Sequence, residues 1–91
     1  LYMQVYIPIK FDILTIEGGI DYAGGNIKLG LKQQDGSWQF KDISSSDFSL
    51  SWTLDNAQIK RNKIEMILSI SDLHPTSTLY LMNNWHLKFS R

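Results

Sequence analysis

Cysteine is absent from the 91 residues of the chain, and histidine occurs only twice. The absence of cysteine excludes a disulfide framework, a thiolate nucleophile and every cysteine-ligated metal centre. Nine basic residues balance nine acidic ones, so the chain lacks the basic excess that is typical of nucleic-acid-binding proteins. We therefore expect no nucleic-acid partner. A net charge near zero favours association with a partner protein or with further copies of the chain, as a homo-oligomer.

Long apolar runs are also missing. No segment approaches the ~20 consecutive apolar residues of a membrane-spanning helix, and none has the hydrophobic region of a signal peptide. The composition, 43% hydrophobic and 20% charged, is that of an ordinary globular domain. Because the length suits one domain and the first residue is Leu1, we expect residues 1–91 to form a single all-β domain that is processed or excised from a larger protein.

Catalytic and cofactor-binding motifs are absent as well. The sequence contains no HExxH, no GxSxG and no glycine-rich phosphate loop. Its acidic residues are dispersed and mostly lie beside turns, where Asp has a local backbone role. His74 lies two residues from Asp72, where a surface loop is favoured over a metal site, and His86 lies alone on a strand. We predict a protein that is not an enzyme and that holds neither a metal ion nor a cofactor.

Alternation of apolar and polar residues is the dominant pattern. It is clearest over residues 48–54, where Phe, Leu and Trp alternate with Ser and Thr, as in a strand with one buried face. The same pattern recurs over 2–13, 20–22, 27–31, 38–41, 57–59, 64–70, 79–81 and 85–89. Short strands at this regular spacing predict an antiparallel β-sandwich of the jelly-roll or immunoglobulin-like kind, with a small β-barrel as the alternative.

Glycine pairs and one change of parity predict how these strands are connected. Turns are expected at Gly18–Gly19 and at 24–26, so residues 14–31 are expected to form a hairpin. Asp35–Gly36 predicts a two-residue type I′ turn. The apolar parity changes between Ile13 and Leu14, which indicates a β-bulge within one strand.

The predicted core consists of the apolar side chains that share one parity in each strand. These are Val5, Ile7, Ile9, Phe11, Leu29, Leu31, Phe40, Phe48, Leu50, Trp52, Leu54, Ile64, Met66, Leu68, Ile70, Leu79, Leu81, Leu87 and Phe89. On the opposite parity, Ser49, Ser51 and Thr53 are expected to share a hydroxyl-rich face with Ser69 and Ser71, if 48–54 pairs with 64–71.

Aromatic residues supply the candidate binding site. Trp38 and Trp85 each follow a turn, and a flat indole face packs well on a sugar ring. Tyr2 and Tyr6 share one face of a strand, roughly 13 Å apart at ~3.3 Å per residue, and Tyr22 also falls outside the apolar pattern. Exposed aromatic side chains on a sheet often mark an interface. The competing interpretation, favoured for each tryptophan, places these rings in the core or beneath a second layer.

The function that fits these features is a non-catalytic recognition domain that binds carbohydrate or protein, with an extracytoplasmic or surface location. Two alternatives remain. One is a structural or assembly domain, such as an oligomer, virion or appendage subunit or an inhibitor; the other is a small lipid or ligand carrier, which requires an open barrel. The basic segment 60–63 is interpreted as a solubilising hairpin tip in preference to a contact for phosphate or an anionic surface.

Overall fold

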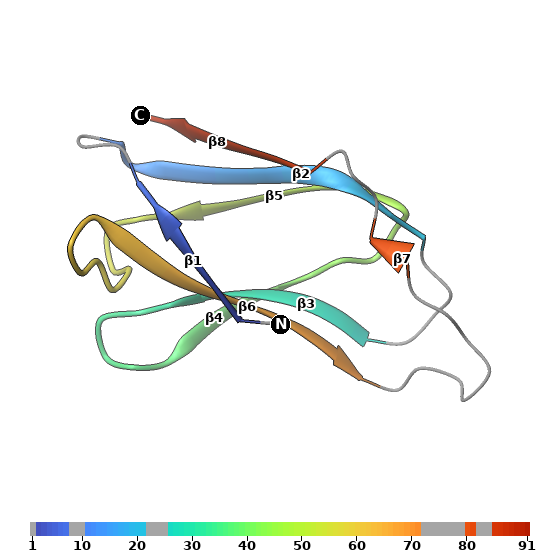
Figure 1. Ribbon diagram of the computed structural model, residues 1–91, viewed down its shortest axis with the longest axis horizontal. Coiled ribbons are helices and arrows are strands. Elements are labelled where there is room, and N and C mark those ends of the chain that lie inside the picture. Colours follow the sequence, from blue (N-terminus) through green and yellow to red (C-terminus); the bar gives the residue numbers. More distant parts are fainter. Residues whose placement is uncertain (1, 8–10, 22–25, 72–79, 82–84) are drawn as a thin grey trace.

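The structure, a computed structural model, describes residues 2–7, 11–21, 26–71, 80–81 and 85–91. Its strands are β1 (Tyr2–Tyr6), β2 (Ile13–Asp21), β3 (Asn26–Lys32), β4 (Trp38–Asp42), β5 (Asp47–Thr53), β6 (Lys63–Ser71), β7 (Tyr80–Leu81) and β8 (His86–Ser90). They form two antiparallel sheets that face each other across a shared interior (Figure 1). The predicted all-β sandwich is therefore confirmed, and the alternative of a closed barrel is wrong.

The chain passes repeatedly from one sheet to the other. One sheet, the β6 sheet, has the strand order β1-β6-β3-β4. In the other, the β2 sheet, β2 pairs with β5 along one edge and with β8 and β7 along the other. Because β2 and β3 belong to different sheets, the expected hairpin over 14–31 does not exist. Among neighbouring strands of the β6 sheet, β3 and β4 alone are also consecutive in the sequence.

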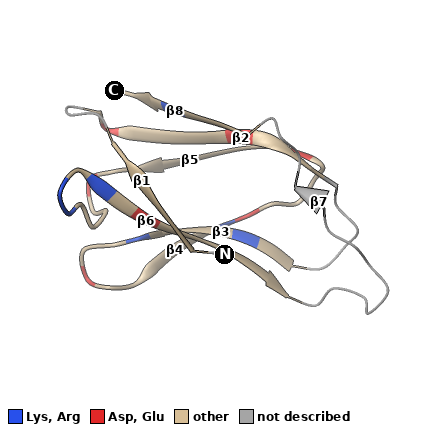
Figure 2. Cartoon of the chain, viewed as in Figure 1, with Lys and Arg blue, Asp and Glu red and all other residues tan. Residues whose placement is uncertain are grey.

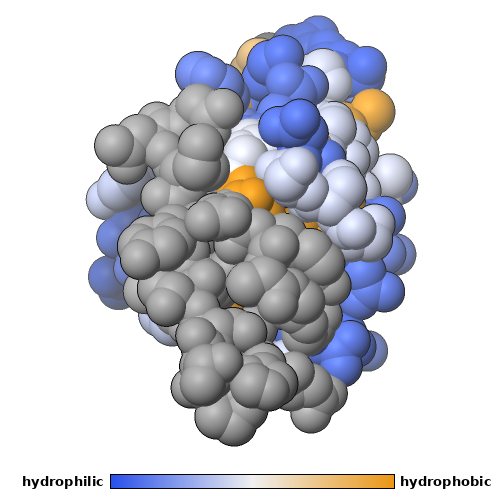
Figure 3. Space-filling view, turned by 90° about the vertical axis from the view of Figure 1, so that its right-hand side faces the viewer, coloured by the Kyte–Doolittle hydropathy of each residue, from blue (hydrophilic) through white to orange (hydrophobic). Residues whose placement is uncertain are grey.

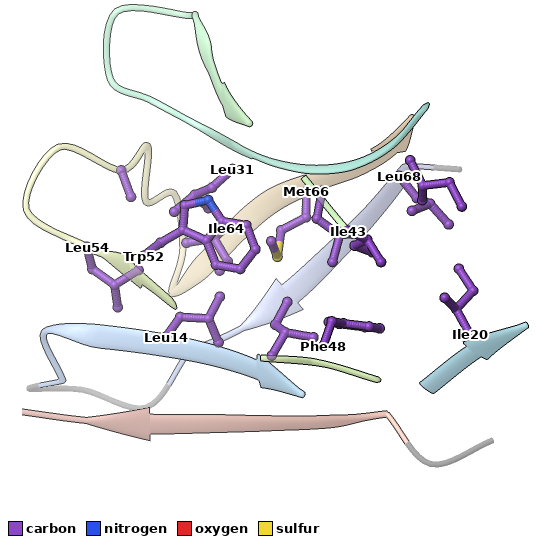
Figure 4. Packing of buried hydrophobic residues seen from close by; sticks show 14 residues of the cluster. Leu14, Ile20, Leu31, Ile43, Phe48, Trp52, Leu54, Ile64, Met66 and Leu68 are labelled. Atoms are coloured by element: carbon purple, nitrogen blue, oxygen red, sulfur yellow. The ribbon is translucent and has the colours of Figure 1, made fainter. Parts of the chain in front are cut away.

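Every second residue of the central strands enters the space between the sheets (Figure 4). The buried core consists of Leu14, Ile16, Ile20, Ile27, Leu29, Leu31, Ile43, Phe48, Trp52, Leu54, Ala57, Ile64, Met66 and Leu68. Trp52 is the largest of them, with 1% of its surface exposed. Its indole Nε1 donates a hydrogen bond of 3.1 Å to the Gln39 carbonyl oxygen in the opposite sheet. The polar atom of this ring is therefore satisfied although the ring is buried.

The predicted core is only partly confirmed. Phe40, Ile70 and Leu87 are exposed by 45%, 41% and 41% of their surfaces, and their assignment to the core is wrong. Ile70 and Leu87 lie near strand ends or on an edge strand, where little packs against them. The core also contains residues that the strand pattern missed, namely Leu14, Ile16, Ile20, Ile27, Ile43 and Ala57. Ile9 and Leu79 lie outside the described residues, as does the side chain of Leu81.

The change of parity at Ile13 is not a bulge within one strand. Strand β1 ends at Tyr6 in the β6 sheet, and β2 begins at Ile13 in the β2 sheet, so the two halves of the pattern belong to two different strands. Gly18–Gly19 is not a turn either, because both glycines lie inside β2. A Cβ atom on Gly18 would lie 2.5 Å from Cδ1 of Trp85. Glycine is needed there for close approach of the indole ring.

The loop between β3 and β4 sets the register of that hairpin. The Gly36 N–H donates to the Gln33 carbonyl (3.0 Å), the Gln33 N–H donates to the Ser37 carbonyl (2.8 Å), and Gly36 has a φ of +88°. This is a three-residue loop that ends in a left-handed residue and a bulge. The expected two-residue type I′ turn at Asp35–Gly36 is therefore wrong.

The longer loop reverses the faces of β4. A two-residue turn at 35–36 would place Leu31 opposite Phe40, but in the structure Leu31 lies opposite Gln39. A shift of one residue turns every side chain of a strand to the other face. For this reason Trp38 and Phe40 face away from the core. On this outer face of the sheet, Phe40 covers Gly30.

Replacement of Trp52 by alanine tests the proposed centre of the core. We expect Trp52→Ala to lower the free energy of unfolding by about 3–5 kcal/mol, because it opens a cavity between the sheets and removes the indole hydrogen bond to the Gln39 carbonyl. Chemical denaturation followed by circular dichroism measures the change. Tyr6→Ala is the control: its ring is 69% exposed, so its loss should cost less than about 1 kcal/mol. Equal losses from both variants would contradict this packing.

Candidate functional site

An apolar row crosses the outer face of the β6 sheet. The strand registers place Tyr2 beside Ile67, Ile67 beside Gly30, and Gly30 beside Phe40. Tyr2 and Phe40 are exposed by 51% and 45% of their surfaces. A Cβ atom on Gly30 would lie 2.8 Å from Cε1 of Phe40 and 3.2 Å from Cγ2 of Ile67. The ring of Phe40 thus lies against the glycine, and the row forms a continuous apolar surface.

A polar row runs beside it on the same face. Lys32 Nζ lies 3.2 Å from Oε2 of Glu65 and 5.9 Å from the centroid of the Trp38 ring. The Tyr2 hydroxyl donates a hydrogen bond to Oε1 of Glu65, and Gln4 lies beside Glu65 in the register. Side chains from all four strands of the β6 sheet are thereby linked, and the charges of Lys32 and Glu65 compensate each other.

Tyr6 extends this surface toward the end of β1. Among the described residues it is the most exposed of the large hydrophobic and aromatic side chains, at 69%, and Lys63 Nζ lies 4.8 Å from the centroid of its ring. We refer to the surface formed by Tyr2, Tyr6, Trp38, Phe40 and Ile67 as the aromatic face. It presents four aromatic rings on one side of one sheet, with polar groups between them.

The contact of Tyr2 with Glu65 shifts the pKa of both groups. The hydroxyl of Tyr2 and, next in importance, the ammonium group of Lys32 hold the pKa of Glu65 below its ordinary value of 4.5. The same contact raises the pKa of Tyr2 above 10.0. The carboxylate therefore stabilises the fold above pH 4.5, and that contribution is lost as the pH falls through the lowered pKa. The protonated hydroxyl of Tyr2 stabilises the fold below pH 10, and that stabilisation is lost as the pH rises through the raised pKa of Tyr2.

Trp85 does not join the aromatic face. Its indole Nε1 donates a 2.7 Å hydrogen bond to the Gly19 carbonyl, and its ring meets Phe48 edge-on at a centroid distance of 5.0 Å. It is half-buried against the core, beside the β2 sheet. The structure thus brings together Tyr2, Tyr6 and Trp38 from the predicted binding residues and places Trp85 elsewhere. Tyr22 lies outside the described residues.

The outer face of the β2 sheet has a different character. Strand β5 pairs with β2, so Ser49, Ser51 and Thr53 share a face with Thr15 and Glu17. The hydroxyls of Thr15 and Ser51 lie 2.8 Å apart, and Lys88 Nζ donates to Glu17 at 3.0 Å. The expected continuation of this face through Ser69 and Ser71 is wrong, because β6 belongs to the other sheet.

An open hollow of about 420 Å³ also lies on the β2 sheet, lined by Glu17, Gly18, Asp47, Phe48, Ser49 and His86. The carboxylate of Glu17 is engaged by Lys88 there. Within the part of the chain that the structure describes, no three His, Asp or Glu residues are grouped in a way that could hold a metal ion.

The sequence pattern does not reveal several residues of the candidate site. It places Phe40 in the core and does not identify Lys32, Glu65 and Ile67 as neighbours of Tyr2 or Trp38. Their proximity depends on the order β1-β6-β3-β4, which joins segments that lie far apart in the sequence. The opposite charges of Lys32 and Glu65, both on the polar parity of their strands, were the one available signal.

Comparison with protein-family models, with curated proteins and with solved structures finds no match to this chain. Over the described segments, no helix is long and apolar enough to cross a membrane. Figure 3 shows the end of the sandwich at the right of Figure 1, where the described surface is mainly hydrophilic and the hydrophobic areas are small. Because no related protein suggests a site, the candidate site rests on the geometry of the aromatic face.

Replacement of Tyr2 by phenylalanine tests the network. We expect Tyr2→Phe to raise the pKa of Glu65 toward its ordinary value, because the largest cause of the lowered pKa is removed while Lys32 remains. A pH titration of the Glu65 side-chain carboxyl carbon by NMR measures the shift. Tyr6→Phe serves as the control, since no hydrogen bond links Tyr6 to Glu65. An unchanged Glu65 pKa in Tyr2→Phe would show that the hydroxyl does not bind the carboxylate in solution.

Proposed function

We propose that this chain is a non-catalytic recognition domain and that it binds carbohydrate on the aromatic face of the β6 sheet. The observation that carries the proposal is the exposure of Tyr2, Tyr6 and Phe40, by 51%, 69% and 45% of their surfaces, on one side of one sheet. Exposed rings gathered on one face of a soluble domain typically mark a binding surface.

The chemistry between the rings supports a sugar as the ligand. The faces of sugar rings carry C–H groups that pack on aromatic rings, while their hydroxyls need donors and acceptors nearby. Gln4 and the linked pair of Lys32 and Glu65 supply such groups between Tyr2 and Trp38. Because Lys32 and Glu65 compensate each other, this part of the face suits a neutral, polyhydroxylated ligand.

The arrangement of the apolar row supports binding without catalysis. Residues of the apolar row lie side by side on adjacent strands, about 4.8 Å apart from one strand to the next, and Phe40 fills the space above Gly30. An extended chain of sugars can lie across such a surface. General acid–base catalysis needs titratable groups that converge on a reacting atom, and the aromatic face carries Glu65 as its one carboxylate among the described residues.

Carbohydrate binding is tested by a glycan array followed by titration of the intrinsic fluorescence. We expect Trp38 emission to change on addition of the sugar that binds. Phe40→Ala and Tyr6→Ala should each weaken binding by about 1.5–3 kcal/mol, roughly 10- to 150-fold in Kd. Leu87→Ala, which removes an exposed apolar side chain from the opposite sheet, should leave Kd unchanged. An array without hits, together with an unchanged fluorescence, would contradict carbohydrate binding and favour a protein partner for the same face.

A second candidate function, assembly by strand pairing, is supported by the edge strand β5. Among the described strands it pairs only with β2. Its sequence, DFSLSWT, contains no Lys and no Pro, the residues that commonly protect an edge from pairing with another chain. Edge pairing of two copies would continue the β2 sheet from one molecule into the next.

Sedimentation tests this second candidate. If two copies pair through β5, the weight-average mass should rise with concentration for the natural chain. Ser49→Lys should keep the chain monomeric, because antiparallel pairing would bring like charges together along the edge. Ser44→Lys, at an exposed residue outside β5, is the charge control and should associate as the natural chain does. A natural chain that is monomeric at all concentrations would rule out assembly through this edge.

A further inference from the structure

A basic hollow adjoins the aromatic face at the end that carries Tyr6. It has a volume of about 350 Å³ and is lined by Gln4, Gln58, Lys60, Arg61, Lys63 and Glu65. Two of these residues, Gln4 and Glu65, also belong to the polar row beside the aromatic face. Figure 2 shows the basic residues of this tip together, at the left-hand end of β6. The hollow and the aromatic face thus form one continuous surface.

The backbone of the tip brings like charges together. Lys60 and Lys63 exchange two backbone hydrogen bonds, of 3.0 and 2.9 Å, and so stand directly opposite each other. Like charges at directly opposed positions of paired strands destabilise the pairing. Arg61 and Asn62 complete the turn with φ angles of 54° and 62°. Glycine and asparagine adopt this left-handed conformation with least strain, and arginine does so at a cost.

The charges of the tip are compensated only in part: Lys60 contributes to the lowered pKa of Glu65, but after the Tyr2 hydroxyl and Lys32. Glu65, the one acidic residue of the hollow, lies 3.2 Å from Lys32 and accepts a hydrogen bond from Tyr2. Lys63 Nζ is directed over the Tyr6 ring. Among the described residues, Lys60, Arg61 and Lys63 form no ion pair. Three cations therefore gather at one end of a chain whose net charge is zero.

Residues that oppose the stability of the fold are commonly retained at functional sites. We infer that this hollow binds the anionic group of an acidic carbohydrate, either a carboxylate or a sulfate ester. The inference rests on the proposed function, because the remainder of the sugar chain would lie on the aromatic face. Lys60, Arg61 and Lys63 supply the positive charge, and the amides of Gln4 and Gln58 supply hydrogen bonds to hydroxyls. Tyr6 borders the hollow and provides a ring on which the charged sugar packs.

The test compares acidic with neutral oligosaccharides by isothermal titration calorimetry. The probes are oligogalacturonate, a heparin-derived oligosaccharide and a neutral cello-oligosaccharide of the same length. We expect at least one acidic probe to bind about tenfold more tightly than the neutral one at low ionic strength, and this advantage should shrink as salt screens the charges. The double variant Lys60→Gln/Lys63→Gln should remove the advantage. Lys88→Gln, which removes the same type of charge on the opposite sheet, should retain it.

Arg61→Gly separates loss of binding from loss of folding. Glycine adopts the left-handed conformation at position 61 without strain, so the melting temperature should stay the same or rise. Affinity for the acidic probe should nevertheless fall, because the guanidinium group is gone. Weaker binding in a variant of equal or greater stability supports a ligand contact. Unchanged affinity for the acidic probe in both Arg61→Gly and the double variant would overturn the inference.

The remaining outcomes distinguish this inference from the proposed function. Binding of neutral and acidic sugars with equal affinity would overturn the basic site and leave carbohydrate binding on the aromatic face intact. Failure of every sugar to bind would overturn both. A polyglutamate peptide that binds as tightly as the acidic sugar, with an affinity that Tyr6→Ala does not change, would assign the hollow to an acidic protein partner and overturn the carbohydrate assignment.

Discussion

The three-residue length of the β3–β4 loop is the constraint on which the outer surface of the domain depends. Gly36 ends this loop with a φ of +88°, and Leu31 lies opposite Gln39. A loop one residue shorter would turn Trp38 and Phe40 toward the interior and leave Lys41 and Gln39 outside. The length of one loop thus determines whether these two rings contribute to the core or to the surface. Gly30 then allows the outward Phe40 to lie against the sheet.

The core of the sandwich does not need the rings of β4. Trp52 extends from β5 toward β4 and donates its indole N–H to the Gln39 carbonyl. A residue of the β2 sheet thus fills the interior beside β4. Ile43 follows β4 and is 2% exposed, and its N–H donates to the Ile27 carbonyl at 2.8 Å. Because Trp52 and Ile43 cover the interior at this edge, Trp38 and Phe40 are free to face solvent. The outward rings of β4 are therefore not required to fill the interior at this edge.

The sequence predicted features that depend on neighbouring residues and missed those that depend on distant ones. Alternation within residues 48–54 identified β5 and the burial of Phe48, Trp52 and Leu54, because the two faces of a strand follow from its own residues. Whether Ile13 and Leu14 mark a bulge or a new strand depends on the passage between the sheets, which the pattern of residues does not contain. The outward position of Phe40 depends on whether the loop has two or three residues, and Asp35–Gly36 is compatible with both. The candidate site was correspondingly predicted as isolated aromatic residues, and the contacts among Tyr2, Glu65 and Lys32 follow only from the strand order.

The two ends of the aromatic face differ in how their charges are arranged, so that one end is neutral and the other is positively charged. Between Tyr2 and Trp38, Lys32 and Glu65 lie on adjacent strands and compensate each other at 3.2 Å. At the tip, Lys60 and Lys63 are also adjacent, but here two like charges face each other. Charges of either sign, at either end of the face, would be enough to keep the domain in solution. Opposite charges at positions 60 and 63 would in addition stabilise the hairpin pairing at the tip. The gathering of three cations beside Tyr6 therefore gives this end of the aromatic face a positive charge that the other end lacks.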